Sequence, residues 1–138
     1  MLRRDSRFVL DNNLVIASIK SGWTRSSDLL FSILLSDATL FVDVELLFEY
    51  EKYINKIIGL PHLFLLLKRR ARLANPSNDS LFACKPFFPE KQYADVVHAA
   101  TCMEESAILI TNDGHFKEIK ESGLIEVWSI SEAIRKIL

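Results

Sequence analysis

Short apolar runs alternate with longer stretches of helical periodicity along this chain. We expect buried strands at residues 7–10, 39–42, 107–111 and 125–128. In the longer stretches, apolar residues recur three and four positions apart, which predicts helices. We expect these helices over residues 14–20, 24–36, 44–58, 63–74, 92–105 and 115–120, and from about residue 131 onward. The alternation favours a mostly parallel central sheet flanked by helices on both faces.

Turn-forming residues mark where some of these elements end. Residues 59–61 (Gly-Leu-Pro) should end the helix over 44–58, because proline cannot continue a helix and glycine permits a left-handed turn. Residues 75–79 (Asn-Pro-Ser-Asn-Asp) are the plainest loop of the chain. Residues 80–90 give no clear pattern, and we assign no element to them.

The composition is typical of one globular domain. The chain has 138 residues, of which 49% are hydrophobic and 25% are charged. A chain of this length can bury a core, and this composition does not fit a disordered protein. The sequence contains no internal repeat and no low-complexity segment. We therefore predict a single α/β domain over residues 1–138.

The overall charge does not by itself favour nucleic-acid binding. The formal net charge is -1, from 17 basic and 18 acidic side chains, whereas proteins that neutralise many phosphates are usually clearly basic. A nucleic-acid role therefore needs a bound metal or a local basic patch. Residues 68–72 (Lys-Arg-Arg-Ala-Arg) are the candidate patch. They are equally well explained as a solvated helix end that suits the helix dipole.

Cysteine usage and hydropathy indicate the compartment. Cys84 and Cys102 have no metal-ligand spacing, so neither a disulfide framework nor a zinc site is expected, and a reduced cytoplasmic compartment fits best. The most apolar run, residues 60–67, is interrupted by Pro61 and His62 and is far shorter than the roughly 20 residues of a membrane helix. The first residues lack the apolar stretch of a signal peptide, so we expect a cytoplasmic protein without membrane contact.

Two acidic residues follow directly after predicted strands. Asp11 comes after the strand at 7–10, and Asp113 comes after the strand at 107–111. In open parallel sheets the carboxyl ends of the strands form the edge where ligands bind. Two strands that each bring an aspartate to this edge therefore indicate a functional site.

Two acidic residues on predicted helices are candidates for the same site. Asp95 begins an otherwise apolar helix, although an acid in a first helical turn is also explained by the helix dipole. Glu49 lies between large apolar residues, and Glu45 is its rival, one turn earlier on the same side. The order of the four acids along the chain, more than any one of them, favours a shared function.

Carboxylates in one cleft repel each other unless a cation neutralises them. Oxygen ligands select hard ions such as Mg²⁺ or Mn²⁺, which also bind substrate phosphates. Such an ion polarises a phosphodiester and lowers the pKa of a water that attacks it. The acids therefore predict metal-dependent phosphodiester hydrolysis.

In their order along the chain, the segments that carry these acids resemble the motifs of PIN domains. Residues 11–15 (Asp-Asn-Asn-Leu-Val) are similar to the opening Asp-Thr-Asn-x-Leu of that family, and residues 46–50 resemble the helix that carries its glutamate. Residues 94–100 resemble its aspartate followed by an alanine-rich helix, and residues 108–116 its closing Thr-x-Asp-x-Asp-Phe segment. Each motif alone is weak, but together the four motifs cover about residues 7–128 in the correct order.

The resemblance implies a Rossmann-like fold and a ribonuclease that depends on Mg²⁺ or Mn²⁺. It implies that Asp11, Asp95 and Asp113 bind the metal and that Glu49 completes the ligand set or positions a water. It also implies that Asn13 and Thr111 brace the aspartates at the strand ends. The family is often dimeric, and many small prokaryotic members are VapC-type toxins held inactive by an antitoxin. RNA, an antitoxin protein and a second copy of the chain are therefore the partners to consider.

The sequence departs from the PIN pattern at two positions. Asn12 replaces the usual threonine, which removes a hydroxyl near the metal. His115 stands where a further acid is common, so the site has fewer negative charges and His115 becomes a candidate contact to metal or substrate. Both departures bear on the level of activity more than on the fold.

Three other functions compete with a nuclease. A PIN module that binds RNA or protein without cutting is the main alternative, although all four acids are present. A phosphatase of the haloacid dehalogenase type needs a second aspartate where Asn13 stands. A P-loop hydrolase is excluded, because the chain has no Gly-Lys-Ser/Thr turn.

Several remaining residues have both a structural and a functional interpretation. His98, on an apolar helix face, is more typical of a core or rim histidine than of a ligand. The aromatic cluster Phe82, Phe87 and Phe88 fits packing or a dimer contact better than base stacking. Trp23 and Trp128 are expected in the core or in an interface.

Overall fold

A five-stranded sheet forms the centre of the molecule, with the strand order β3-β2-β1-β4-β5. The computed structural model describes residues 2–138. Its strands are β1 (Arg7–Leu10), β2 (Thr39–Val42), β3 (Ala71–Leu73), β4 (Ile108–Ile110) and β5 (Val127–Trp128). Every neighbouring pair is parallel. The α/β fold class that the sequence predicts is therefore confirmed.

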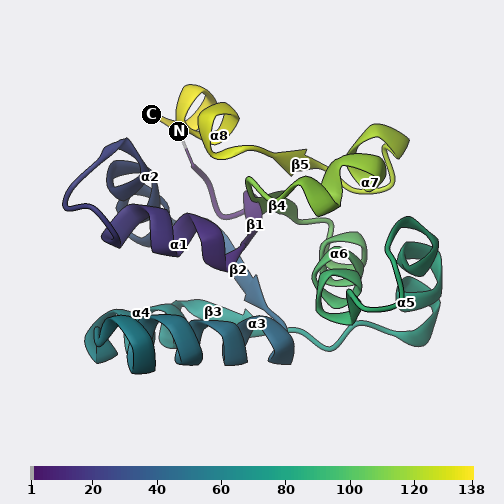
Figure 1. Cartoon of the computed structure of the whole chain (residues 1–138). Helices are drawn as coiled ribbons and strands as arrows, with labels where there is room; N and C mark the ends of the chain where they lie inside the picture. The colour runs from purple at the N-terminus through teal and green to yellow at the C-terminus, as the bar shows by residue number, and fades with distance from the viewer. Residues whose placement is uncertain (1) are drawn as a thin grey trace.

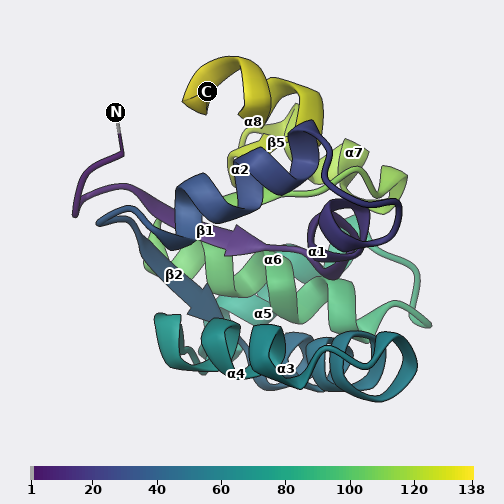
Figure 2. The same cartoon turned by 90° about the vertical axis from the view of Figure 1, so that its left-hand side faces the viewer.

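Helices flank the sheet on both faces (Figure 1). Helices α1 and α2 lie on one face and α5 and α6 on the other, and the view turned by 90° looks onto the face with α1 and α2 (Figure 2). The helical elements are α1 (Asn12–Ile19), α2 (Arg25–Leu34), α3 (Val44–Tyr50), η1 (Glu51–Ile58), α4 (Pro61–Arg70), α5 (Asn78–Cys84), η2 (Lys85–Phe87), α6 (Tyr93–Glu105), η3 (Gly114–Phe116), α7 (Lys117–Ser122) and α8 (Ile130–Ile137). Within residues 2–138, none of these helices combines the length and the apolar character needed to cross a bilayer.

The register of the central strands brings their carboxyl ends to one edge of the sheet. Leu10, the last residue of β1, is paired with Ile110, the last residue of β4. The next residues after β1, β2 and β4 are Asp11, Asp43 and Thr111. Because parallel strands end at the same edge, these three polar residues lie next to one another at the position where such sheets bind ligands.

The apolar side chains of the strands and the inner helix faces form one core cluster. The largest fully buried side chains are Phe8, Phe116, Leu10, Leu14, Leu29, Leu30, Ile33, Leu46, Ile54, Leu67, Leu109 and Ile110. Burying each such side chain contributes about 1.5–3 kcal/mol to folding. Cys84 and Cys102 are free thiols inside this core. The strands that lead to the site are thus part of this packed core.

Strand β3 is the main feature that the sequence interpretation missed. We expected one helix over residues 63–74, but α4 ends at Arg70 and residues 71–73 form β3 at the edge of the sheet. Leu73 pairs with Val42 of β2, and the N–H of Ala74 donates to the carbonyl of Val42 at 2.8 Å. Three residues are too few to show the alternation that marks a strand, so the edge of β2 decides their conformation.

The expected helix over residues 44–58 changes type in the middle. Residues 44–50 are α-helical, and residues 51–58 form a π-helix, whose hydrogen bonds span five residues. Gly59 ends it with a left-handed backbone, φ 81°, and Pro61 then takes the first position of α4. The helix end expected at residues 59–61 is therefore confirmed. Residues 80–90, which gave no clear pattern, contain the end of α5 and the short η2.

Candidate active site

Asp11 is buried at the carboxyl end of β1, where it also begins α1. Its Oδ1 atom accepts the N–H of Asn12 at 2.8 Å, and its Oδ2 atom accepts the hydroxyl of Thr111 at 2.6 Å. Burial raises the pKa of Asp11, and the hydrogen bond from Thr111 only partly offsets this effect. A carboxylate held in this way gains from a nearby cation, because a cation stabilises its charged form.

Thr111 connects the two strand ends of the site. Its hydroxyl oxygen accepts the side-chain amide of Asn13 at 3.1 Å and the backbone N–H of Asp113 at 2.9 Å. The same hydroxyl donates to Asp11. The structure thus places Asn13 and Thr111 beside the aspartates that the sequence analysis expected them to brace. The hydrogen bonds also fix the backbone that carries Asp113.

Glu49, and not Glu45, lies close to Asp11. Glu49 comes from the last turn of α3, and its carboxylate lies with ligand atoms of Asp11 and His98 in a group whose members are all within 4.8 Å of one another. Glu45 is one turn earlier and lines a hollow with Asp43 and Tyr93, to which neither Glu49 nor Asp11 contributes. No metal-competent group among residues 2–138 includes Glu45.

A second group contains Asp95, Asp113 and His115. The Nδ1 atom of His115 lies 3.0 Å from an oxygen of Asp95 and 3.3 Å from an oxygen of Asp113. Burial raises the pKa of Asp95, the hydrogen bond from His115 lowers it, and the neighbouring charge of Asp113 raises it further. Asp95 lies in the first turn of α6, while Asp113 caps η3 after β4. The four acids singled out from the sequence therefore lie in two groups of two.

His98 is a site residue that the sequence interpretation treated as a core histidine. Only 1% of its side chain is exposed, yet Nδ1 lies 2.8 Å from an oxygen of Asp43 and Nε2 lies 2.8 Å from an oxygen of Glu49. Burial alone lowers the pKa of His98, but the hydrogen bonds and charges of Asp43 and Glu49 outweigh it and raise the pKa to about 10. Burial raises the pKa values of Asp11 and Asp95, and the charge of His98 opposes this rise in both. His98 therefore interacts electrostatically with both groups.

Asp43 is the second site residue that was missed, although a signal for it exists. It is 1% exposed, and its Oδ1 atom caps α3 by accepting the N–H of Leu46 at 2.8 Å. Its Oδ2 atom contacts His98 and accepts the hydroxyl of Thr101 at 3.4 Å. Asp43 directly follows the expected strand at 39–42, as Asp11 follows β1. The criterion that selected Asp11 also applies to Asp43.

The donor set fits a divalent metal ion. Each group offers two carboxylates, which are the ligands that Mg²⁺ and Mn²⁺ prefer, together with one imidazole. Asn12, directly after Asp11, has a buried Oδ1 atom without a hydrogen-bond partner, which a cation or a bound water would satisfy. In each group one imidazole nitrogen lies against a carboxylate oxygen, at 2.8 Å for His98 and Glu49 and at 3.0 Å for His115 and Asp95.

Other candidate features are placed away from this chemistry. The guanidinium of Arg70, part of the expected basic patch, donates to the backbone carbonyls of Leu34, Ser36 and Ala38 at 2.8–3.3 Å. Arg70 therefore holds the end of α2 in place and is not free for phosphate. Trp23 is 68% exposed, so it is not a core residue.

The members of the expected aromatic cluster differ in burial. Phe88 is buried and meets Phe116 edge to face, whereas Phe82 is 71% exposed. Packing therefore accounts for Phe88 but not for Phe82.

Known proteins share the fold of this chain without close sequence similarity. No protein-family model and no curated protein matches the sequence. The structure of VapBC-1 from nontypeable Haemophilus influenzae contains a similar chain, with TM-score 0.62 and 18% identity, over 91% of this chain and 98% of that chain. The structure of FitAB bound to an IR36 DNA fragment contains another, with TM-score 0.61 and 18% identity, over 89% and 94%. This likeness shows a shared fold, in agreement with the fold expected from the motifs.

Proposed function

We propose that this protein is a divalent-metal-dependent endoribonuclease that hydrolyses phosphodiester bonds of single-stranded or structured RNA. The observation that carries the proposal is the position of four carboxylates, in two pairs, beside the carboxyl ends of the neighbouring strands β1 and β4. Asp11, Glu49, Asp95 and Asp113 come from four different elements, far apart in the sequence. Protein surfaces place most acids on solvated helix faces, so this arrangement favours a site for a cation and an anionic substrate.

The four acids would hold Mg²⁺ or Mn²⁺. Asp11 and Glu49 would act from one side of the site, and Asp95 and Asp113 from the other side. When bound, such an ion supplies charge stabilisation for the phosphodiester and a water of lowered pKa. The protein side chains would position the metal ligands and the substrate. Thr111 fixes the Asp11 carboxylate, and His115, with 51% of its side chain exposed, can donate a hydrogen bond to a substrate phosphate.

RNA cleavage with and without EDTA tests the proposal. Cleavage with Mn²⁺ should stop when EDTA is added and should be lost in Asp11→Asn and in Asp95→Asn. Both variants should keep the circular dichroism spectrum of the parent, because each replacement preserves the shape of the side chain. Glu121→Gln, at an exposed helix position, is the control and should cleave normally. Undiminished cleavage by either aspartate variant would refute the site.

The imidazoles support a second candidate, a PIN-like module that binds RNA or a protein without cutting. His98 and His115 already lie against Glu49, Asp95 and Asp113, where a catalytic ion would bind. A purified protein that binds RNA but leaves it intact at every Mn²⁺ concentration would favour this reading. Cleavage that requires the ion would exclude it.

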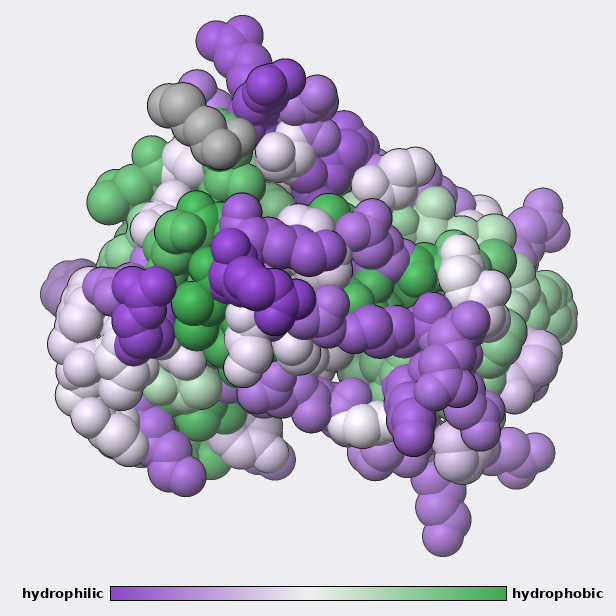
Figure 3. Space-filling model, turned by 90° about the horizontal axis from the view of Figure 1, so that it is seen from above, coloured by the Kyte–Doolittle hydropathy of each residue, from purple (hydrophilic) through white to green (hydrophobic). Residues whose placement is uncertain are grey.

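A narrower proposal is that the protein is the toxin of a toxin–antitoxin pair. The region of α3, η1 and α4 exposes several large apolar side chains, which favours a protein partner. They are Phe48, Ile57, Leu60, Leu65 and Leu66. On the opposite face, seen from above in Figure 3, polar side chains break the apolar surface into small areas. Growth arrest on expression, relieved by a neighbouring small reading frame, would support an antitoxin, and normal growth would argue against it.

We also propose that the chain forms a homodimer, as members of the family that its motifs resemble often do. Light scattering after gel filtration should then give twice the 15.8 kDa of one chain. A monomer at every concentration would refute the dimer without affecting the nuclease proposal.

A further inference from the structure

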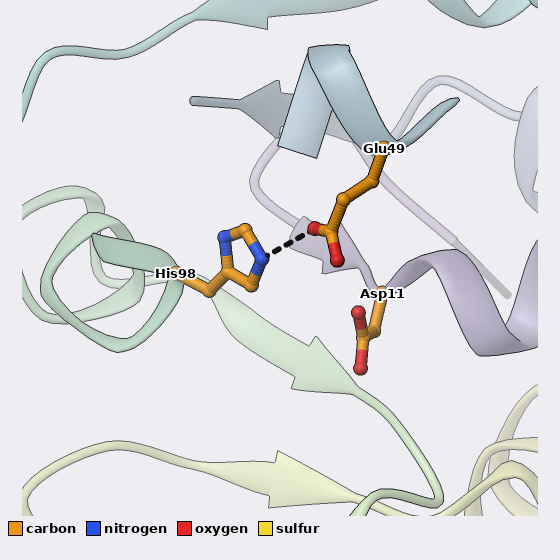
Figure 4. Close-up of side chains that lie close together, drawn as sticks. All are labelled: Asp11, Glu49 and His98. Carbon is orange, nitrogen blue, oxygen red and sulfur yellow. Dashed lines mark hydrogen bonds and ion pairs between the residues drawn. The ribbon is translucent and has the colours of Figure 1, made fainter. Parts of the chain in front are cut away.

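His98 faces the site from α6, opposite the acids that β1 and α3 provide (Figure 4). The close-up shows Asp11, Glu49 and His98 converging from three elements, with a hydrogen bond between the imidazole and Glu49. One ligand atom from each residue lies within 4.8 Å of the others. Nitrogen and oxygen donors are thus gathered around one point next to the end of β1.

Asp43 fixes the orientation of the His98 ring. The Nδ1 atom of His98 lies 2.8 Å from the Oδ2 atom of Asp43, and both side chains are 1% exposed. A carboxylate can only accept, so Nδ1 carries its hydrogen toward Asp43. This leaves Nε2 on the side of Glu49 and Asp11. Histidines that bind metals usually donate their other ring N–H to a carboxylate, which orients the ring and raises its basicity as a ligand.

We propose that His98 is a metal ligand through Nε2, so that Asp11, Glu49 and His98 form a two-carboxylate, one-imidazole site oriented by Asp43. The inference deepens the proposed function, and it rests on that function only in requiring that a divalent ion binds here. It adds His98, which the sequence interpretation treated as a core or rim histidine, to the ligands at this site.

The proton on Nε2 must leave when the ion binds. In the metal-free protein, both ring nitrogens lie 2.8 Å from carboxyl oxygens, and both carry hydrogens when the two carboxyl groups are ionised. Binding then exchanges one proton for one ion: imidazolium and M²⁺ give the imidazole complex and H⁺, while the other hydrogen stays on Nδ1 and is donated to Asp43. The carboxyl groups that face the ring are those of Asp43, Glu49 and Asp11.

A nitrogen ligand changes the choice of metal. Imidazole suits transition metals, whereas Mg²⁺ prefers oxygen ligands and retains its waters. The site should therefore bind Mn²⁺ more tightly than Mg²⁺. The alternative is that His98 stays an imidazolium and acts only as a counter-charge beside an ion held by carboxylates.

Pulsed electron paramagnetic resonance on the Mn²⁺-loaded protein distinguishes the two roles. We expect a ¹⁴N coupling from a bound imidazole, which changes to ¹⁵N when the protein is labelled with ¹⁵N-histidine. His115→Gln is the matched control, because His115 belongs to the other acid group, and it should keep the coupling. Absence of the coupling in the wild-type protein, or its loss in His115→Gln, would overturn the proposal.

Calorimetry gives an independent measurement that does not need RNA. In two buffers of different ionisation enthalpy, Mn²⁺ binding at neutral pH should release about one proton per ion from the wild-type protein, since metal ligands must be deprotonated. Asp43→Asn should weaken Mn²⁺ binding by about 10- to 100-fold, as loss of such a supporting carboxylate usually does, and His98→Gln at least as much. Tighter binding in His98→Gln would show a counter-charge and refute the ligand. Mn²⁺ bound through His98 without RNA cleavage would refute only the nuclease.

Discussion

The hydroxyl of Thr111 donates a 2.6 Å hydrogen bond to Asp11 and so joins the ends of the neighbouring strands β1 and β4. Thr111 is 3% exposed and Asp11 7%, so water is nearly absent from this contact. Because burial raises the pKa of Asp11, the hydroxyl is one of the few groups that favour its charged form. The hydrogen bond therefore favours the charged form of the carboxylate on which the proposed metal site depends.

Replacing Thr111 with valine should impair both metal binding and stability. Valine keeps the shape of threonine but leaves Oδ2 of Asp11 and the amide of Asn13 without a partner. We expect Mn²⁺ affinity to fall by about 10- to 100-fold and the free energy of unfolding by about 1–3 kcal/mol. Thr111→Ser retains the hydroxyl and should lose much less of either. Equal losses in both variants would mean that the methyl group, and not the hydroxyl, matters.

The two glutamates of α3 should differ in their effect on cleavage. Glu49→Gln removes a charge that lies against His98 and near Asp11, whereas Glu45→Gln changes a residue in a hollow to which neither Glu49 nor Asp11 contributes. We expect the initial rate of RNA cleavage with Mn²⁺ to fall by at least about 100-fold in Glu49→Gln, the effect usual for loss of one charge-stabilising group. Glu45→Gln should stay within a few-fold of the parent. The reverse order would show that the wrong glutamate was assigned to the site.

Arg70 should matter for stability and not for RNA binding. Its guanidinium donates to carbonyls at the end of α2, and hydrogen bonds from charged groups contribute about 1.5–3 kcal/mol each when buried. Because Arg70 is only partly buried, we expect Arg70→Ala to lower the free energy of unfolding by about 2 kcal/mol in urea titrations. Arg69→Ala, at an exposed neighbour, should change it by less than about 0.5 kcal/mol. A stable Arg70→Ala variant with weakened RNA binding would contradict this assignment.

Most of the fold could be predicted because its strands and helices are periodic. β1, β2, β4 and the long helix α6 follow the apolar pattern closely. β3 could not be found, because its three residues continue a helical pattern and become a strand only beside β2. The change to a π-helix after Tyr50 could not be predicted from the sequence either, because the apolar spacing of the segment suits an ordinary α-helix.

The candidate site could be predicted where position alone marked a residue. Asp11 and Asp113 follow strands, and the structure places both at the same edge. His98 could not be recognised from its apolar neighbours, because its partners Asp43 and Glu49 are about 50 positions away in the sequence and meet it only through packing of α3 against α6. The sequence shows only a histidine among apolar residues, whereas the structure shows that a carboxyl group contacts each of its two ring nitrogens.

Stability of the metal-free protein should depend on pH through His98. The pKa of His98 is raised from 6.5 to about 10 in the folded protein, since Asp43 and Glu49 outweigh the opposing effect of burial. A raised pKa stabilises the fold fully below the unfolded value and loses its effect as pH rises to the folded value. The contribution of His98 is therefore complete below about pH 6.5 and should decline up to about pH 10.

The decline is measurable as a difference between two proteins. In EDTA, the free energy of unfolding of the wild-type protein minus that of His98→Gln should fall between pH 6.5 and 10, by about 1.4 kcal/mol per pH unit at most, the slope for one proton. Subtraction of the variant removes the titration of lysines and tyrosines that both proteins share. If the difference between the wild-type protein and His98→Gln were flat from pH 7 to 9, the ring would be neutral in the folded protein, and one of its two carboxylate contacts would have to be carried by a protonated acid.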